Sequence, residues 1–94
     1  MIKNFLHKGA QAFFERGTTR GIDAAWSKRL QDRLTVLDDA QELEDINLPG
    51  WRLHPLKGNR EGTWALQLTR NFRVTFRFET GDVVDVNIED YHEG

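Results

Sequence analysis

The sequence of 94 residues contains no cysteine, two prolines and a single tyrosine. The lack of cysteine excludes disulfide bonds and thiolate metal sites, and it fits a reducing compartment. No apolar run reaches the roughly 20 residues that a membrane-spanning helix needs, and the N-terminus lacks the apolar segment of a signal peptide. We therefore expect a cytoplasmic protein that does not enter a membrane.

A surplus of basic charge is also missing. The net charge is −2 and the isoelectric point about 5.9, which taken alone disfavours a nucleic-acid partner, because phosphate binding needs lysine and arginine. The charges are unevenly distributed, however. Residues 51–77 carry 6 basic side chains and 1 acidic one, whereas residues 78–94 carry 6 acidic side chains and no basic ones. A basic segment thus precedes an acidic end, although a mixed solvated surface would give the same pattern.

The first half of the chain has helical periodicity. The segment Lys8–Arg16 holds several apolar residues before a glycine, which is a typical stop signal. Asp23 is a candidate N-cap for a second helix with apolar residues at helical spacing. These apolar residues are Trp26, Leu30, Leu34 and Leu37. We expect Lys28, Arg29 and Arg33 of this helix to face mostly solvent.

The second half changes to the alternating pattern of β-strands. Apolar and polar residues alternate over 51–55, 63–69, 72–78 and 84–89, with short turns at 70–71 and 80–82. Sequential strands joined by short turns favour an antiparallel meander. We therefore predict an α+β fold in which two N-terminal helices pack on one face of an antiparallel β-sheet. Residues 2–5 are considered as an additional edge strand.

The two faces of this sheet should differ in character. The face toward the helices is expected to hold Trp64, Leu66, Phe72, Val74, Phe76, Val84, Val86 and Ile88. The opposite face should hold Gln67, Arg73, Thr75, Arg77 and Asn87. A polar, partly cationic face beside loops is typical of a binding site rather than of a core.

Several side chains fit the cutting of RNA without a metal ion. In that reaction the ribose 2′-OH attacks the neighbouring phosphorus, so a base, an acid and a cation that stabilises the phosphate are needed. Histidine titrates near neutral pH and can act as acid or base, and an aromatic ring can stack on a nucleotide base. The candidate catalytic residues are His54, Lys57, Arg73, Asp90, Tyr91 and His92.

Other interpretations of these residues are simpler or compete with this one. Taken singly, a histidine at a strand end or an arginine on a polar face is usually just solvated. A metal site would combine His54, Asp90, His92 and Glu93. No pair of histidines has the spacing of ligands on one helix, and no glycine-rich nucleotide-binding motif occurs. We therefore expect neither a metal ion nor a cofactor.

Three ordered motifs resemble one family. The run 53–64, LHPLKGNREGTW, resembles the Leu-His-Pro-Leu-Lys-Gly segment of HigB toxins in the RelE/ParE superfamily. The run 71–76, NFRVTF, is similar to their Asn-Trp-Arg strand, with Phe72 in place of the commoner Trp. The end EDYH at 89–92 is similar to their terminal Asp-Tyr-His. The runs 1–5 and 14–17 match as well, so the resemblance covers essentially the whole chain.

The resemblance implies a single RelE/HigB-like toxin domain over residues 1–94, the toxin component of a type II toxin–antitoxin system. A toxin of this kind is an mRNA interferase, an endoribonuclease that cuts messenger RNA in the A site of the 30S ribosomal subunit. The cut leaves a 2′,3′-cyclic phosphate and inhibits translation. The implied partners are the ribosome, messenger RNA and a HigA-like antitoxin with a helix-turn-helix domain.

The resemblance also implies roles at the matching positions. His92 is the leading acid or base, Asp90 supports it, and Tyr91 stacks on or positions the nucleotide. His54 and Lys57 bind the phosphate or share the proton transfer, and which residue is acid and which is base stays open.

Transition-state stabilisation is implied for Arg73. Further contacts with RNA or the ribosome are expected from basic residues of the central segment and the second helix. These residues are Arg52, Arg60, Arg77, Lys28, Arg29 and Arg33.

Two alternative functions stay open. The net negative charge, in a family whose toxins are often basic, favours a catalytically weak RelE-fold module that holds its antitoxin and tunes operon repression. Hydrolysis of free RNA away from the ribosome is the other alternative.

Overall fold

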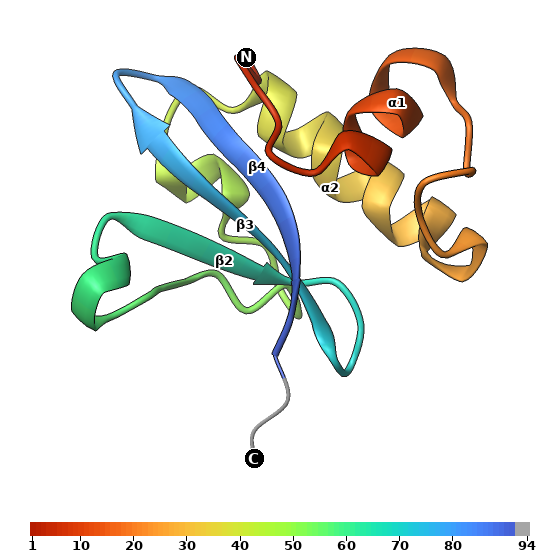
Figure 1. Ribbon diagram of the computed structural model, residues 1–94. Helices are drawn as coiled ribbons and strands as arrows, with labels where there is room; N and C mark the ends of the chain where they lie inside the picture. The colour runs from red at the N-terminus through yellow and green to blue at the C-terminus, as the bar shows by residue number, and fades with distance from the viewer. Residues whose placement is uncertain (92–94) are drawn as a thin grey trace.

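The computed structural model describes residues 1–91, and the predicted catalytic residue His92 lies outside them. The helices are α1 (Lys8–Arg16) and α2 (Ser27–Asp39), with short 3₁₀ helices at Ala24–Trp26, Leu43–Ile46 and Gly58–Arg60 (Figure 1). The strands are β1 (His54–Pro55), β2 (Thr63–Gln67), β3 (Phe72–Glu79) and β4 (Asp82–Asp90). Neighbouring strands are all antiparallel, in the order β1-β2-β3-β4, which confirms the predicted α+β meander.

Polar side chains cap the start of α1 and of the 3₁₀ turn that leads into α2, whereas Trp26 at the N-cap of α2 makes no side-chain hydrogen bond. The Nδ1 atom of His7 accepts a hydrogen bond of 3.0 Å from the backbone N–H of Ala10 at the start of α1. Gly17 ends α1 with a φ of 75°, a left-handed conformation that glycine adopts without strain. Asp23 caps a 3₁₀ turn that runs directly into α2, and its carboxylate accepts from Ala25 N–H at 2.9 Å.

A single apolar core lies between the helices and the sheet. Leu30, Leu34 and Leu37 of α2 are buried in it, as their helical spacing predicts, together with Ala10 of α1. The sheet contributes the buried side chains Leu66, Val74, Phe76, Val83, Val86 and Ile88. Figure 1 shows α1 and α2 on the same side of the sheet, so the opposite face is left for a site. None of the helices within residues 1–91 has the length and apolar character needed to cross a membrane.

The pairing of β3 with β4 contains a β-bulge. Near the turn Arg77 pairs with Val84, but farther along Thr75 pairs with Asn87, so β4 carries one extra residue between them. Asp85 lies in this interval with a φ of 55°. The extra residue reverses which side chains of β4 face the core. Val83 is therefore fully buried and Val84 is not, contrary to the expectation for Val84.

The N-terminal segment holds the bulge in place. The side chain of Asn4 accepts a hydrogen bond from the backbone N–H of Asp85 at 3.0 Å and donates one to its carboxylate at 2.8 Å. Parallel bridges join Ile2 to Val83 and Phe5 to Val86. Residues 2–5 thus cover the edge of β4 as two isolated bridges rather than as a continuous strand.

The strand expected over 51–55 is shorter in the structure. Arg52 has a φ of 55°, which interrupts the extended backbone, and only His54 and Pro55 pair with β2. The carbonyl of Trp51 accepts a hydrogen bond of 2.8 Å from Gln67 N–H, so the chain still follows the edge of β2.

The cap of α1 predicts a pH dependence of stability. Burial lowers the pKa of His7, and only an imidazole nitrogen without a proton can accept from Ala10. Because the unfolded chain takes up the proton first, the contribution is complete above about pH 6.5 and decreases as the pH falls toward the lowered pKa. We expect about 1 kcal/mol of the free energy of unfolding to depend on this cap.

The measurement is urea unfolding of the wild type and of His7→Asn at about pH 7.5 and about pH 5. Asparagine retains an acceptor at both pH values, so the variant should lose less stability on acidification. An equal loss in both proteins would show that His7 does not cap the helix through its neutral form.

Candidate active site

The sheet face opposite the helices carries cross-strand rows of polar side chains. Because side chains alternate along a strand, residues paired across neighbouring strands point to the same face. One row consists of His54, Ala65, Thr75 and Asn87. The next row consists of Gln67, Arg73 and Glu89. The predicted residues His54 and Arg73 therefore lie on one face, in adjacent rows.

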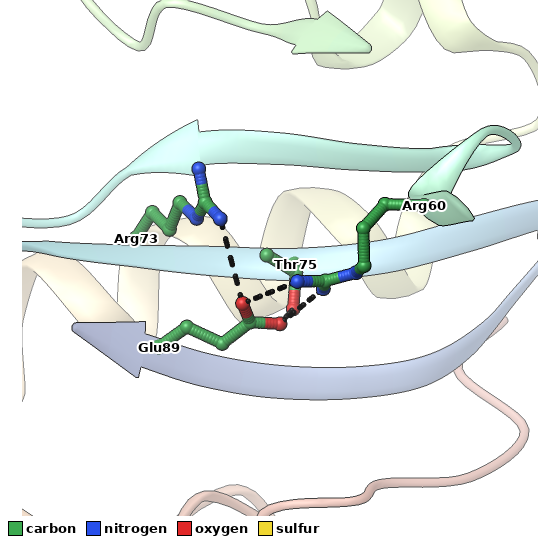
Figure 2. Close-up of polar contacts among 4 residues, drawn as sticks. All are labelled: Arg60, Arg73, Thr75 and Glu89. Carbon is green, nitrogen blue, oxygen red and sulfur yellow. Dashed lines mark hydrogen bonds and ion pairs between the residues drawn. The ribbon is translucent and has the colours of Figure 1, made fainter. Parts of the chain in front are cut away.

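The carboxylate of Glu89 is the centre of this face (Figure 2). Arg60, from the connection between β1 and β2, donates to both of its oxygens at 3.0 and 2.6 Å. The hydroxyl of Thr75 donates to Oε2 at 2.7 Å. Arg73 Nη2 lies 3.5 Å from Oε1, which is an ion pair but too long for a good hydrogen bond.

These contacts keep Glu89 ionised. The hydrogen bond from Arg60 lowers the pKa of Glu89 most, and Thr75 and the charges of Arg60 and Arg73 lower it further, against the opposing effect of burial. The same pairing raises the pKa of Arg60. The face thus carries a fixed negative charge surrounded by two guanidinium groups.

Arg73 is held against Tyr91. Its guanidinium carbon lies 4.8 Å from the centre of the Tyr91 ring, a cation–π contact. Tyr91 itself is positioned by its backbone N–H, which donates to the carbonyl of Asn71 at 2.8 Å. The side chain of Arg73 is 17% exposed, and its buried Nε atom has no hydrogen-bond partner among residues 1–91. A cation with incomplete hydrogen bonding next to a ring suits a phosphate and its base.

His54 has one ring nitrogen fixed by the backbone. Its Nδ1 atom lies 2.6 Å from the carbonyl oxygen of Arg52. Since a carbonyl can only accept, Nδ1 must carry the proton, and in the neutral ring Nε2 then has a free lone pair. The half-buried imidazole is therefore oriented with Nε2 able to accept a proton.

Lys57 lies at the margin of the site. It is exposed immediately before the 3₁₀ helix Gly58–Arg60, and no acidic side chain within residues 1–91 forms an ion pair with it. A hollow of about 420 Å³ lies beside it, lined also by Pro55, Glu61 and Trp64. The lysine can approach a polyanion from the solvent side.

Asp90 is not part of the same row as Arg73. It pairs with Phe72, so strand alternation directs its side chain to the face opposite Glu89. Asp90 is exposed at the end of β4. His92, which would complete the predicted grouping, lies outside the described residues.

Five of the six residues expected to contact RNA lie in three kinds of environment. Arg52, Lys28 and Arg29 are exposed. Lys28 and Arg29 belong to α2, which packs on the sheet face opposite to the one that carries Glu89. Arg77 is partly exposed and loosely paired with Glu79 at 3.5 Å. Arg60 is committed to Glu89.

Arg33 differs from the expectation of a solvent-facing residue. It is 9% exposed, its Nε donates to the carbonyl of Gln67 at 2.7 Å, and its Nη1 donates to the carbonyl of Arg29 at 3.2 Å. Its guanidinium also stacks 4.6 Å over Trp51. Burial and the nearby Arg29 charge lower the pKa of Arg33. Arg33 therefore has a structural role, because it supplies the hydrogen bond to the carbonyl of Gln67, the last residue of β2.

The sequence pattern did not identify Glu89 or Thr75 as members of the site. Thr75 was placed on the polar face, but its hydroxyl is fully committed to Glu89 and the residue is buried. Glu89 was grouped with the acidic end of the chain. Among residues 1–91, no three His, Asp or Glu side chains come together as a metal site would require.

The fold is that of small bacterial toxins. The chain superposes on a chain of the YoeB–YefM complex from Staphylococcus aureus with a TM-score of 0.62 at 16% identity, covering 98% of this chain and 95% of that one. It also matches a YoeB/ParE toxin from Agrobacterium tumefaciens with a TM-score of 0.57 at 14% identity, covering 95% of both chains. The structure thus has the fold seen in YoeB/ParE toxins.

The sequence narrows this class to one family. The family described as "RelE-like toxin of type II toxin-antitoxin system HigB" matches residues 3–92. The chain is 47% identical over 92 residues to Endoribonuclease HigB of Proteus vulgaris, covering 98% of this chain and all of that one. It is 26% identical over 91 residues to Toxin HigB-1 of Vibrio cholerae, covering 95% and 96%. The chain therefore belongs to the HigB-like toxins of type II toxin–antitoxin systems, as its motifs predict.

The structural role of Arg33 predicts a difference between two neighbouring arginines of α2. Arg33→Ala leaves the Gln67 carbonyl without a partner and removes the contact with Trp51, so the free energy of unfolding should fall by about 2 kcal/mol. Arg29→Ala removes an exposed side chain and should change it by less than about 0.5 kcal/mol. Urea unfolding of both variants tests this. Equal stability of the two variants would contradict the structural assignment.

Proposed function

We propose that this toxin is an mRNA interferase, an endoribonuclease that cuts messenger RNA in the ribosomal A site and so inhibits translation. The observation that carries the proposal is that His54 and Arg73 lie in adjacent rows of the polar face, with the Tyr91 ring against Arg73. The name of the relative at 47% identity, Endoribonuclease HigB, supports it. The reaction needs no metal or other cofactor, because side chains supply the base, the acid and the cation.

In the proposed reaction the 2′-oxygen forms a bond to phosphorus and the bond to the 5′-oxygen breaks. The products are a 2′,3′-cyclic phosphate and a free 5′-hydroxyl. Negative charge grows on the phosphate oxygens, and Arg73 stabilises it. Tyr91 stacks on or positions the nucleotide, since its ring already lies against Arg73.

Proton transfer is assigned to histidines and their neighbours. Because Nδ1 of His54 is fixed on the Arg52 carbonyl, Nε2 faces the substrate: without a proton it accepts the 2′-OH proton, and with one it donates to the phosphate. His92 is proposed as the other member of the acid–base pair, with Asp90 supporting it. Lys57 approaches from solvent and holds the phosphate as a second cation.

The wider contacts of the toxin follow from its charges. Arg52 and Arg77 extend the positive charge beside the site, and Lys28 and Arg29 would meet ribosomal RNA on the helical side. A HigA-like antitoxin with a helix-turn-helix domain is proposed as the cognate partner. A substrate on the translating ribosome places the protein in the cytoplasm.

The alternative of a catalytically weak binding module is favoured by the net charge of −2. It predicts antitoxin binding without any cuts in messenger RNA. Primer extension on translating ribosomes separates the two functions, and naked RNA in a parallel reaction tests hydrolysis away from the ribosome.

Arg73→Ala is expected to lower the rate of ribosome-dependent cleavage about 100-fold or more, because it removes the cation at the scissile phosphate. Arg20→Ala is the matched control, since Arg20 is an exposed arginine that forms no ion pair within residues 1–91. Cleavage would be mapped by primer extension, with circular dichroism to verify folding. Wild-type rates for a folded Arg73→Ala variant would refute the proposed site.

A further inference from the structure

Arg60 is the best-connected cation of the polar face, although the sequence suggested an RNA contact for it. Two of its nitrogens point at two oxygens of Glu89, the fork-to-fork geometry that makes arginine–carboxylate pairs strong. Arg77 offers a contrast, because its contact with the more exposed Glu79 is single and 3.5 Å long. Arg77 can exchange its partner for a phosphate at little cost, whereas Arg60 would have to break two short bonds.

Glu89 has a second arginine within reach. Its Oε1 atom lies 3.5 Å from Arg73 Nη2, and both side chains are largely buried, at 20% and 17% exposed. In such partly buried surroundings a nearby cation strongly stabilises an ionised carboxylate, because water solvates its charge only in part. If Arg60 were absent, Arg73 would be the nearest cation for Glu89. A carboxylate paired closely with Arg73 would compete with the phosphate that Arg73 is proposed to hold.

We propose that Arg60 is a positioning residue that neutralises Glu89 and thereby keeps Arg73 available for the scissile phosphate. The inference rests on the proposed role of Arg73 in cutting RNA. Arg60 acts through Glu89 and not through the substrate. Thr75 contributes by holding Oε2, while Oε1 accepts from Arg60 Nη1 at 3.0 Å and lies 3.5 Å from Arg73 Nη2.

The test is a double-mutant cycle in ribosome-dependent cleavage. Arg60→Ala should lower the maximal cleavage rate about tenfold, since Glu89 then competes for Arg73. Adding Glu89→Gln should restore most of that loss, because glutamine can still accept from Thr75 but carries no charge. Arg60→Lys, which retains the charge without the fork, should fall between Arg60→Ala and the wild type.

Arg77 provides the matched control. Arg77→Ala removes the same charge from the same face without freeing Glu89, so Glu89→Gln should give no restoration in that background. A double variant Arg60→Ala/Glu89→Gln as slow as Arg60→Ala would overturn the proposal and favour direct RNA binding by Arg60. Wild-type cleavage by Arg60→Ala would also overturn it. Thermal unfolding verifies that each variant is folded.

A titration that does not depend on activity separates this inference from the proposed function. Carbon-13 NMR of the Glu89 carboxyl group would be followed with pH in the purified chain. If the carboxylate passes from Arg60 to Arg73, Arg73→Ala should raise the pKa of Glu89 more in the Arg60→Ala background than in the wild type. Equal increases in both backgrounds would contradict the transfer, even if the toxin cuts no RNA.

Discussion

The arrangement of the polar face depends on the one-residue bulge in β4. Beside the turn Arg77 pairs with Val84, and unbroken pairing from there would bring Ile88 opposite Arg73. The extra residue at Asp85 shifts the register by one, so that Glu89 pairs with Arg73 instead. Asn4 binds Asp85 through two hydrogen bonds. The N-terminal segment thereby fixes a strand whose far end carries the site.

Local charge, and not total charge, determines what this face can bind. The chain is net negative, yet the pairing of Arg60 with Glu89 neutralises the carboxylate that lies 3.5 Å from Arg73. What remains beside Tyr91 is a largely buried guanidinium that is only partly hydrogen-bonded. Lys57 adds an exposed positive charge at the margin of the site, and His54, in the row next to Arg73, adds a ring nitrogen oriented to accept a proton. The acidic composition is therefore compatible with a phosphate-binding site, because screening and pairing confine each charge to short range.

Periodicity was sufficient to predict the helices and strands, since a period of 3.6 and a period of two are direct consequences of backbone geometry. Periodicity failed to predict the positions whose burial or strand pairing depends on tertiary contacts. Arg33 has a charged side chain, but it is buried because it stacks on Trp51 and donates to the Gln67 carbonyl. Alternation puts Glu89 on the polar face beside Asn87, but its pairing with Arg73 could not be obtained by counting from the turn, because the extra residue at Asp85 shifts the register by one. Residue chemistry supplied the catalytic candidates, and the likeness to HigB toxins supplied their roles and the class of reaction.

In the proposed function the scissile phosphate binds on the sheet face that carries Arg73 and Glu89. A structure of the toxin on a translating ribosome, with a 2′-methoxy group blocking cleavage of the A-site codon, would locate that phosphate. We expect it in contact with the Arg73 guanidinium, with a base against Tyr91 and the Arg60–Glu89 pair intact. A codon bound on the α2 side near Lys28 and Arg29, with Arg73 distant from every phosphate, would contradict it.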